Sequence, residues 1–208
     1  MRSMNELSAS KQNQDLFLNN LRQETADSHR KLEENSFSRA ILDTDVTLHS
    51  YQTYLAKLYG VTSGCEKDIY PVLIPVIPDL EKRNKAHLII QDLSDTGVSP
   101  EVIKGLPVYS FKITGVPEAL GAMYVLEGSI LGGKILYKHI NKVLGLDASH
   151  GASYFWGYGM ETGILWKTFI SSLAAFAVHE NCEKEIISSA VQTFTVINNW
   201  LDQATINW

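Results

Sequence analysis

The stretch Tyr124-Val125-Leu126-Glu127-Gly128-Ser129-Ile130-Leu131-Gly132-Gly133 carries three glycines inside a segment whose flanks form helices strongly. Each glycine in the interior of a helix costs about 1 kcal/mol relative to alanine, so something must require a bare backbone here. Gly128 and Gly132, one turn apart, would let a second helix pack closely. Alternatively, they would admit a flat ligand against the helix. The glycines by themselves do not decide between these two explanations.

Apolar residues recur at helical spacing on both sides of this stretch. The second helix has Asp45 or Thr47 as its cap and ends at Pro71. Residues 1–14 read as a flexible amino-terminal segment, and no repeat or linker divides residues 15–208. The pattern predicts one all-α domain. Its helices are expected over residues 18–34, 48–69, 79–93, 117–144, 160–179 and 182–203.

Composition excludes several classes of protein. The chain has 208 residues, with 18 Lys and Arg against 23 Asp and Glu, a net charge of −5. This mild acidity argues against a nucleic-acid surface, which needs a basic face. Cys65 and Cys182 are far apart and match no metal spacing. Neither a signal peptide nor a membrane-spanning segment is expected, and a cytoplasmic location follows.

A second informative segment runs from Leu21 to Glu33. Arg22, His29 and Glu33 share one face of the expected helix. The Glu33 carboxylate can accept the Nδ1 proton of His29 and leave Nε2 free as a metal ligand. Arg22 stands about 10 Å away along the axis, which is about the separation between a haem iron and its propionates. The set suits a haem, and the alternative is a histidine that only completes a hydrogen bond of the core.

Both segments match known motifs. Leu21-Arg22-x-x-Thr25-x-x-x-His29-x-x-Leu32-Glu33 resembles the proximal helix of haem oxygenases, and Gly128-Ser129-x-x-Gly132-Gly133 resembles their distal helix. The likeness covers about residues 16–203 and is greatest to the bacterial branch, which includes enzymes that supply biliverdin to bacterial phytochromes. It implies a single-domain helical bundle that holds haem between a proximal helix and a glycine-rich distal helix.

The resemblance also implies roles for residues at the iron. His29 would be the proximal ligand of the iron, and Glu33 its hydrogen-bonding partner. Gly128 and Gly132 would face bound dioxygen. Ser129 stands where many haem oxygenases carry an aspartate that orders a proton-donating water. A serine hydroxyl can donate a proton but brings no charge and has a shorter reach.

Four further residues are implied to contact the cofactor. Arg22 occupies the position of a propionate contact, and Tyr124 would offer a hydroxyl to a propionate. Lys167 falls where the family has a lysine that faces the propionates, and Gly133 completes the distal glycine motif. For Tyr124 and Lys167 the alternatives are a tyrosine at the edge of the core and a solvated lysine.

The reaction implied is cleavage of haem at a meso carbon to biliverdin, carbon monoxide and ferrous iron. Haem is both cofactor and substrate, O2 is consumed, and electrons come from an external donor such as a ferredoxin or a reductase. A bacteriophytochrome would be a consumer of the product. Two alternatives remain: a haem-binding or trafficking protein without turnover, and a non-haem enzyme of the same superfamily, such as the thiamine-degrading enzymes, which need a nucleophilic cysteine.

Overall fold

The computed structural model describes residues 4–208, with side chains described from Ser10 onward. These residues form helices and connecting loops and contain no strand, which confirms the all-α prediction. The helices in chain order are α1 (Met4–Glu33), α2 (Ser36–Ala40), α3 (Leu48–Gly64), the π-helical turn η1 (Cys65–Ile69), α4 (Tyr70–Leu73), the 3-10 turn η2 (Leu80–Arg83), α5 (Ala86–Asp95), α6 (Pro100–Lys104), α7 (Val116–Leu144), α8 (Ser153–Trp156), the 3-10 turn η3 (Gly159–Glu161), α9 (Thr162–Glu180) and α10 (Glu183–Gln203).

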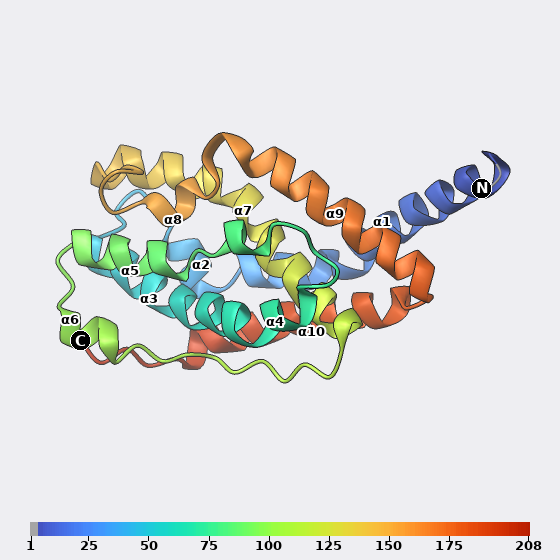
Figure 1. Cartoon of the computed structure of the whole chain (residues 1–208). Coiled ribbons are helices and arrows are strands. Elements are labelled where there is room, and N and C mark those ends of the chain that lie inside the picture. The colour runs from blue at the N-terminus through green and yellow to red at the C-terminus, as the bar shows by residue number, and fades with distance from the viewer. Residues whose placement is uncertain (1–3) are drawn as a thin grey trace.

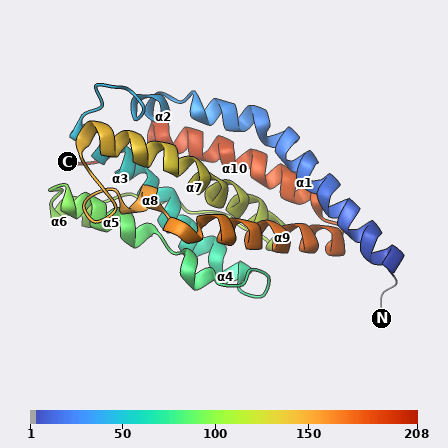
Figure 2. The same cartoon turned by 90° about the horizontal axis from the view of Figure 1, so that it is seen from above.

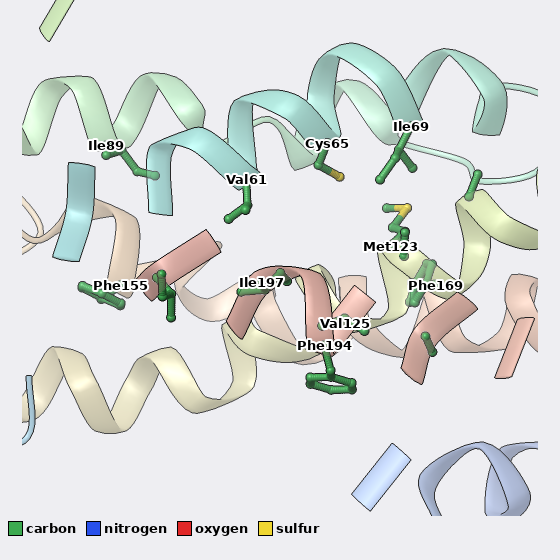
Figure 3. Packing of buried hydrophobic residues seen from close by; sticks show 14 of the residues in the cluster. Val61, Cys65, Ile69, Ile89, Met123, Val125, Phe155, Phe169, Phe194 and Ile197 are labelled. Carbon is green, nitrogen blue, oxygen red and sulfur yellow. The ribbon is translucent and has the colours of Figure 1, made fainter. Parts of the chain in front are cut away.

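Helix α10 is the centre of the bundle, because it packs against α1, α3, α7 and α9. Figure 1 shows α9 and α10 on opposite sides of α7, and the turned view in Figure 2 shows α1 along one flank of the bundle. The core is continuous between these helices. Figure 3 shows Val61, Met123, Phe169 and Ile197, contributed by α3, α7, α9 and α10, gathered in one cluster.

The first helix is longer than the sequence pattern predicts. Residues 4–14, expected to be flexible, are helical, because α1 already begins at Met4. The chain contains neither glycine nor proline before Gly60 to interrupt a helix. The amino-terminal end of α1 extends beyond the rest of the bundle in both views. Residues 1–3 lie outside the described part, and the start of the domain at residue 15 remains a prediction.

The second helix begins as predicted and continues past its expected end. Thr47 is the cap, since its side chain accepts a hydrogen bond from the backbone N–H of Ser50 at 3.1 Å. Pro71 does not end the helix. It lies in the first turn of α4, where a missing N–H costs nothing. The π-helical turn η1 joins α3 to α4 and inserts Cys65 into the core.

The third predicted helix, residues 79–93, is divided in two. Asp79 has a left-handed backbone with φ of 62°, and the short turn η2 follows it. The carboxylate of Glu66 then accepts hydrogen bonds from the backbone N–H groups of Lys85 and Ala86 at the start of α5. These long-range contacts take the place of a continuous helix, and they bring Arg83 into the interior.

Helix α7 is the element that carries the glycines. It is long and apolar enough to cross a membrane by composition alone, and half of its most apolar window is buried inside the fold. It packs against α8, α9 and α10. Its apolar character is therefore accounted for by its position in the core, with one stretch left free to line a cavity.

Candidate functional site

A cavity with a volume of about 1000 Å³ opens between α1 and α7. Most of its lining is apolar, and examples are Leu58, Val61, Leu131, Ile135 and Ile197. Its size reaches the upper end of the range of roughly 300–1,000 Å³ that is typical of cofactor and small-molecule sites. The space is large enough for a flat macrocycle to lie between the two helices.

All but two of the residues predicted for the site line this cavity. Helix α1 supplies one group, and α7 supplies the glycine motif and a tyrosine one turn before it. Segments more than ninety residues apart in sequence therefore meet across the cavity, as the proximal and distal motifs require. The predicted residues that line it are Arg22, His29, Glu33, Tyr124, Gly128, Ser129 and Gly132.

His29 projects from α1 into the cavity with two neighbours around its ring. Its Nδ1 atom lies 3.7 Å from Oε2 of Glu33, one turn further along the helix. This distance is too long for a direct hydrogen bond, so the two groups are neighbours without being bonded. On the other side, the ring of Phe194 meets the imidazole edge-on with 5.5 Å between centroids. Glu33 lies next to Nδ1 of the imidazole, so Nε2 is left free to bind a metal.

The glycine pair on α7 faces open space rather than a packed helix. A Cβ atom built on Gly132 would have no neighbour within 4 Å. One built on Gly128 would meet only the ring of Trp166, at an ordinary contact distance of 3.6 Å. The structure therefore removes the helix-packing explanation for this pair. Of the two explanations, a ligand lying against the helix is the one that remains.

The other two glycines of α7 are packing residues. A Cβ atom on Gly121 would collide with the carbonyl oxygen of Ile186 and come within 2.9 Å of the backbone nitrogen of Ala190, and both residues belong to α10. A Cβ atom on Gly133 would lie 3.2 Å from the carbonyl oxygen of Phe155. Gly133 thus faces α8 instead of the cavity, and its predicted contact with a cofactor has no counterpart in the lining.

Lys167 is the second predicted residue that does not line the cavity. Its side chain is exposed on α9, and the adjacent Trp166 takes the place at the wall. The reason is helical geometry, because neighbouring residues point about 100° apart. A role for Lys167 at the propionates remains a prediction.

Tyr124, Arg22 and Thr25 meet at one end of the cavity. Burial raises the pKa of Tyr124, and a hydrogen bond with Thr25 and the positive charge of Arg22 partly offset that rise. The ring of Tyr124 lies 5.9 Å from that of Trp166. A guanidinium and a neutral hydroxyl close together suit a carboxylate ligand. The propionate contacts of Arg22 and Tyr124 remain a prediction.

Ser129 lines the cavity, but its hydroxyl is already engaged. Its Oγ atom donates a hydrogen bond to the carbonyl oxygen of Leu126, in the preceding turn, at 2.7 Å. This local bond is common for serine in helices. The hydroxyl proton of Ser129 therefore points back along α7 rather than across the cavity.

A buried polar network behind α7 could not be predicted from the sequence pattern. Arg83 is fully buried and donates to Glu127 at 2.6 Å and to the carbonyl oxygen of Leu165 at 3.0 Å. Tyr158 donates to the other carboxylate oxygen of Glu127 at 2.7 Å. The one signal in the sequence is a glutamate in the middle of an apolar helix, which requires a buried partner.

A histidine and an uncrowded glycine pair on the wall of one largely apolar cavity are the arrangement expected of a haem-binding helical protein. The chain belongs to the haem oxygenase family, because the family model described as Heme oxygenase matches residues 15–203. As a member of this family, the protein is a haem-degrading enzyme. No curated protein matches the chain in sequence.

Solved structures agree with this assignment. The heme oxygenase of Neisseria meningitidis, studied with NO and CO bound, is 25% identical, with 90% of each chain covered and a TM-score of 0.69. The heme oxygenase of Leptospira interrogans shares the fold at 16% identity, with 90% of this chain and 98% of that one covered and a TM-score of 0.75. Heme oxygenase-1 of Synechocystis sp. PCC6803, in complex with heme, is 18% identical over 90% of this chain and 91% of its own, with a TM-score of 0.73.

The residues present fit a haem. His29 would hold the iron, the bare backbone at Gly128 and Gly132 leaves room in the cavity, and Arg22 with Tyr124 would hold propionates. The two cysteines belong elsewhere. Both are buried, neither lines the cavity, and burial raises the pKa of both thiols. A nucleophilic cysteine in the manner of the thiamine-degrading enzymes is thus not provided.

Proposed function

We propose that this protein cleaves haem at a meso carbon and yields biliverdin, carbon monoxide and ferrous iron, with O2 and externally supplied electrons. One observation carries the proposal: Gly128 and Gly132 leave the backbone of α7 bare on the wall of the cavity that His29 enters from α1. A protein that only stored haem would gain stability by filling this space with side chains. The bare backbone is explained if a second, small ligand must fit there.

The bound haem supplies an iron that activates dioxygen and the ring that is to be cleaved. The chain supplies the geometry around it. His29 would hold the iron through its imidazole, which donates less electron density than a thiolate, and Glu33 would orient the ring through Nδ1. The apolar side chains of Leu131, Ile135 and Ile197 on the cavity wall would contact the flat apolar ring of the haem.

The partners follow from the same chemistry. Ring opening by O2 consumes electrons, and we assign these to an external donor such as a ferredoxin or a reductase. The resemblance to the bacterial enzymes supports a bacteriophytochrome as a consumer of biliverdin. The composition supports a cytoplasmic location without membrane or nucleic acid.

The test adds hemin to the purified protein and then a reductant under air, with catalase present. We expect a sharp Soret band that decays into a broad red bilin absorption. Replacement of His29 by alanine should abolish the histidine-ligated spectrum. A wild-type protein that forms no Soret band would contradict the proposal.

A haem carrier without turnover is the second candidate. It is favoured by Ser129, whose hydroxyl is bonded to Leu126 and leaves no free proton donor at the position of the usual aspartate. The same experiment separates the two functions. A carrier would show a Soret band that persists after the reductant is added.

A further inference from the structure

A small second cavity lies behind α7, on the side away from α1. Its volume is about 10 Å³, which is about what one water molecule requires. Its wall is mixed: Cys65, Met123 and Leu126 form the apolar part, and Thr62, Tyr70, Lys85, Glu127 and Tyr154 supply polar groups. A buried water needs two to four such partners. The cavity is therefore suited to a single, well-held water.

Lys85 supplies the strongest reason for a ligand in this cavity. Only 5% of the residue is exposed, and no described residue accepts a hydrogen bond from its Nζ atom. The ammonium lies 5.8 Å from the ring centroid of Tyr154 and 5.3 Å from that of Tyr158. Burial lowers the pKa of Lys85, and the charge of Glu127 partly opposes that change. A largely buried ammonium on the wall of this cavity would be stabilised by an oxygen acceptor inside it.

Tyr154 connects the small cavity with the large one. Tyr154 and Leu126 line both cavities, so together they form the wall between them. The hydroxyl of Tyr154 lies 3.3 Å from Oγ1 of Thr62, which also faces the small cavity. Burial raises the pKa of Tyr154 to about 12, so the hydroxyl keeps its proton at neutral pH. Since the O–H bond can rotate, it can donate on one side and accept on the other.

We infer that Lys85, one buried water and Tyr154 form a proton relay that delivers protons into the large cavity. The inference rests on the proposed function, because a protein that only carries haem needs no proton there. The relay would also supply the proton that Ser129 does not offer, because the Ser129 hydroxyl donates to the carbonyl oxygen of Leu126. In this chain the proton donor comes from α8 and the segment before α5 rather than from α7.

The relay moves protons without making or breaking other bonds. Tyr154 gives its hydroxyl proton to an oxygen atom in the large cavity and takes one from the water. The water takes one from the ammonium of Lys85, which becomes a neutral amine. Lys85 then regains a proton from solvent between turnovers. One proton enters the cavity for each proton taken up, and no oxidant or reductant is involved.

The experiment compares Tyr154→Phe and Lys85→Met with Tyr51→Phe as the matched control. Tyr51 is also a buried tyrosine, but its hydroxyl donates to the carbonyl oxygen of Gly151, and it lines neither cavity. We expect bilin formation to fall at least about tenfold in both relay variants, in keeping with the contribution of a general acid. The share of electrons recovered as hydrogen peroxide should rise, because reduced oxygen that is not protonated in the cavity leaves as superoxide, which takes up protons from solvent and disproportionates to hydrogen peroxide and O2.

A second measurement does not depend on turnover. The C–O stretching frequency of the ferrous carbon monoxide complex falls when a donor points at the ligand. Tyr154→Phe should therefore raise this frequency and remove its sensitivity to D2O, whereas Tyr51→Phe should change neither. Tyr154→Phe changes only a hydroxyl, so it remains informative if Lys85→Met does not fold.

The outcomes separate the relay from the proposed function. If wild type forms bilin and both relay variants match Tyr51→Phe in peroxide release and in the C–O frequency, the relay is wrong and the proposed function stands. If wild type binds haem but forms no bilin, the proposed function fails. A loss in Tyr154→Phe with an unchanged Lys85→Met would also overturn the relay, because the ammonium would then have no part in it.

Discussion

The carboxylate of Glu127 lies 2.6 Å from the guanidinium of Arg83, and both side chains are buried directly behind the glycine pair. The same guanidinium donates to the carbonyl oxygen of Leu165. Glu127 precedes Gly128 in the chain, and Leu165 precedes Trp166, whose ring contacts the Cβ position of Gly128. One arginine thus fixes two adjoining parts of the cavity wall.

Loss of this arginine should destabilise the whole fold. Arg83→Met leaves the Glu127 carboxylate buried without its charged partner, and breaking a buried ion pair in this way costs about 3–5 kcal/mol. Urea unfolding of the haem-free protein measures the change. Lys82→Met is the control, since Lys82 is an exposed neighbour and its loss should change little. A loss below about 1 kcal/mol for Arg83→Met, as for a surface pair, would contradict the role assigned to the pair.

The glycines of α7 should separate into two kinds when replaced by alanine. Gly132→Ala places a Cβ atom in open space, so the haem-free protein should gain up to about 1 kcal/mol from the better helix propensity. Gly121→Ala forces a Cβ atom onto the carbonyl oxygen of Ile186 and should destabilise the protein. Urea unfolding of both variants tests this. Equal losses of stability would show that Gly132 is a packing residue after all.

Replacement of His29 should remove the iron ligand and leave the fold intact. His29→Ala is expected to lose the spectrum of a histidine-ligated haem and to bind hemin more weakly. His179→Ala is the matched control, because His179 also lies beside a glutamate, with Nδ1 2.7 Å from Oε1 of Glu180, but on an exposed part of α9. Optical and electron paramagnetic resonance spectra of the hemin complexes measure the effect. An unchanged spectrum in His29→Ala would show that a residue other than His29 binds the iron.

Glu33 should act through the imidazole rather than through the haem itself. Loss of a carboxylate that orients a metal-bound histidine typically lowers metal affinity about 10- to 100-fold. Glu33→Ala should therefore weaken hemin binding by that factor in a competition titration. In a His29→Ala background the same replacement should have no further effect. Additive losses in the double variant would mean that Glu33 contacts the haem directly.

Much of the fold could be predicted from the sequence, because long helices follow from local apolar spacing. The carboxy-terminal end of α1, both ends of α7 and α10, and the cap at Thr47, one of the two candidates, are of this kind. The break before α5 is different, since the Glu66 carboxylate that holds its first N–H groups comes from another helix. Such long-range contacts have no local pattern.

The site shows the same division. His29, Glu33 and the glycine pair could be predicted because helical spacing places each group on one face. The sequence could not show that Gly133 packs on α8 while Gly132 faces the cavity, since only the position of a neighbouring element decides this. A role for Tyr154 and Lys85 could not be predicted from the sequence for the same reason, because only the fold brings these two residues together.

The most direct test of the account is mass spectrometry of the product formed from hemin under ¹⁸O2, with a reductant and catalase present. We expect an open-chain bilin that carries the heavy isotope in both of its terminal carbonyl oxygens, together with labelled carbon monoxide. Recovery of intact haem, or of a degradation product whose oxygen comes from water or peroxide, would contradict it.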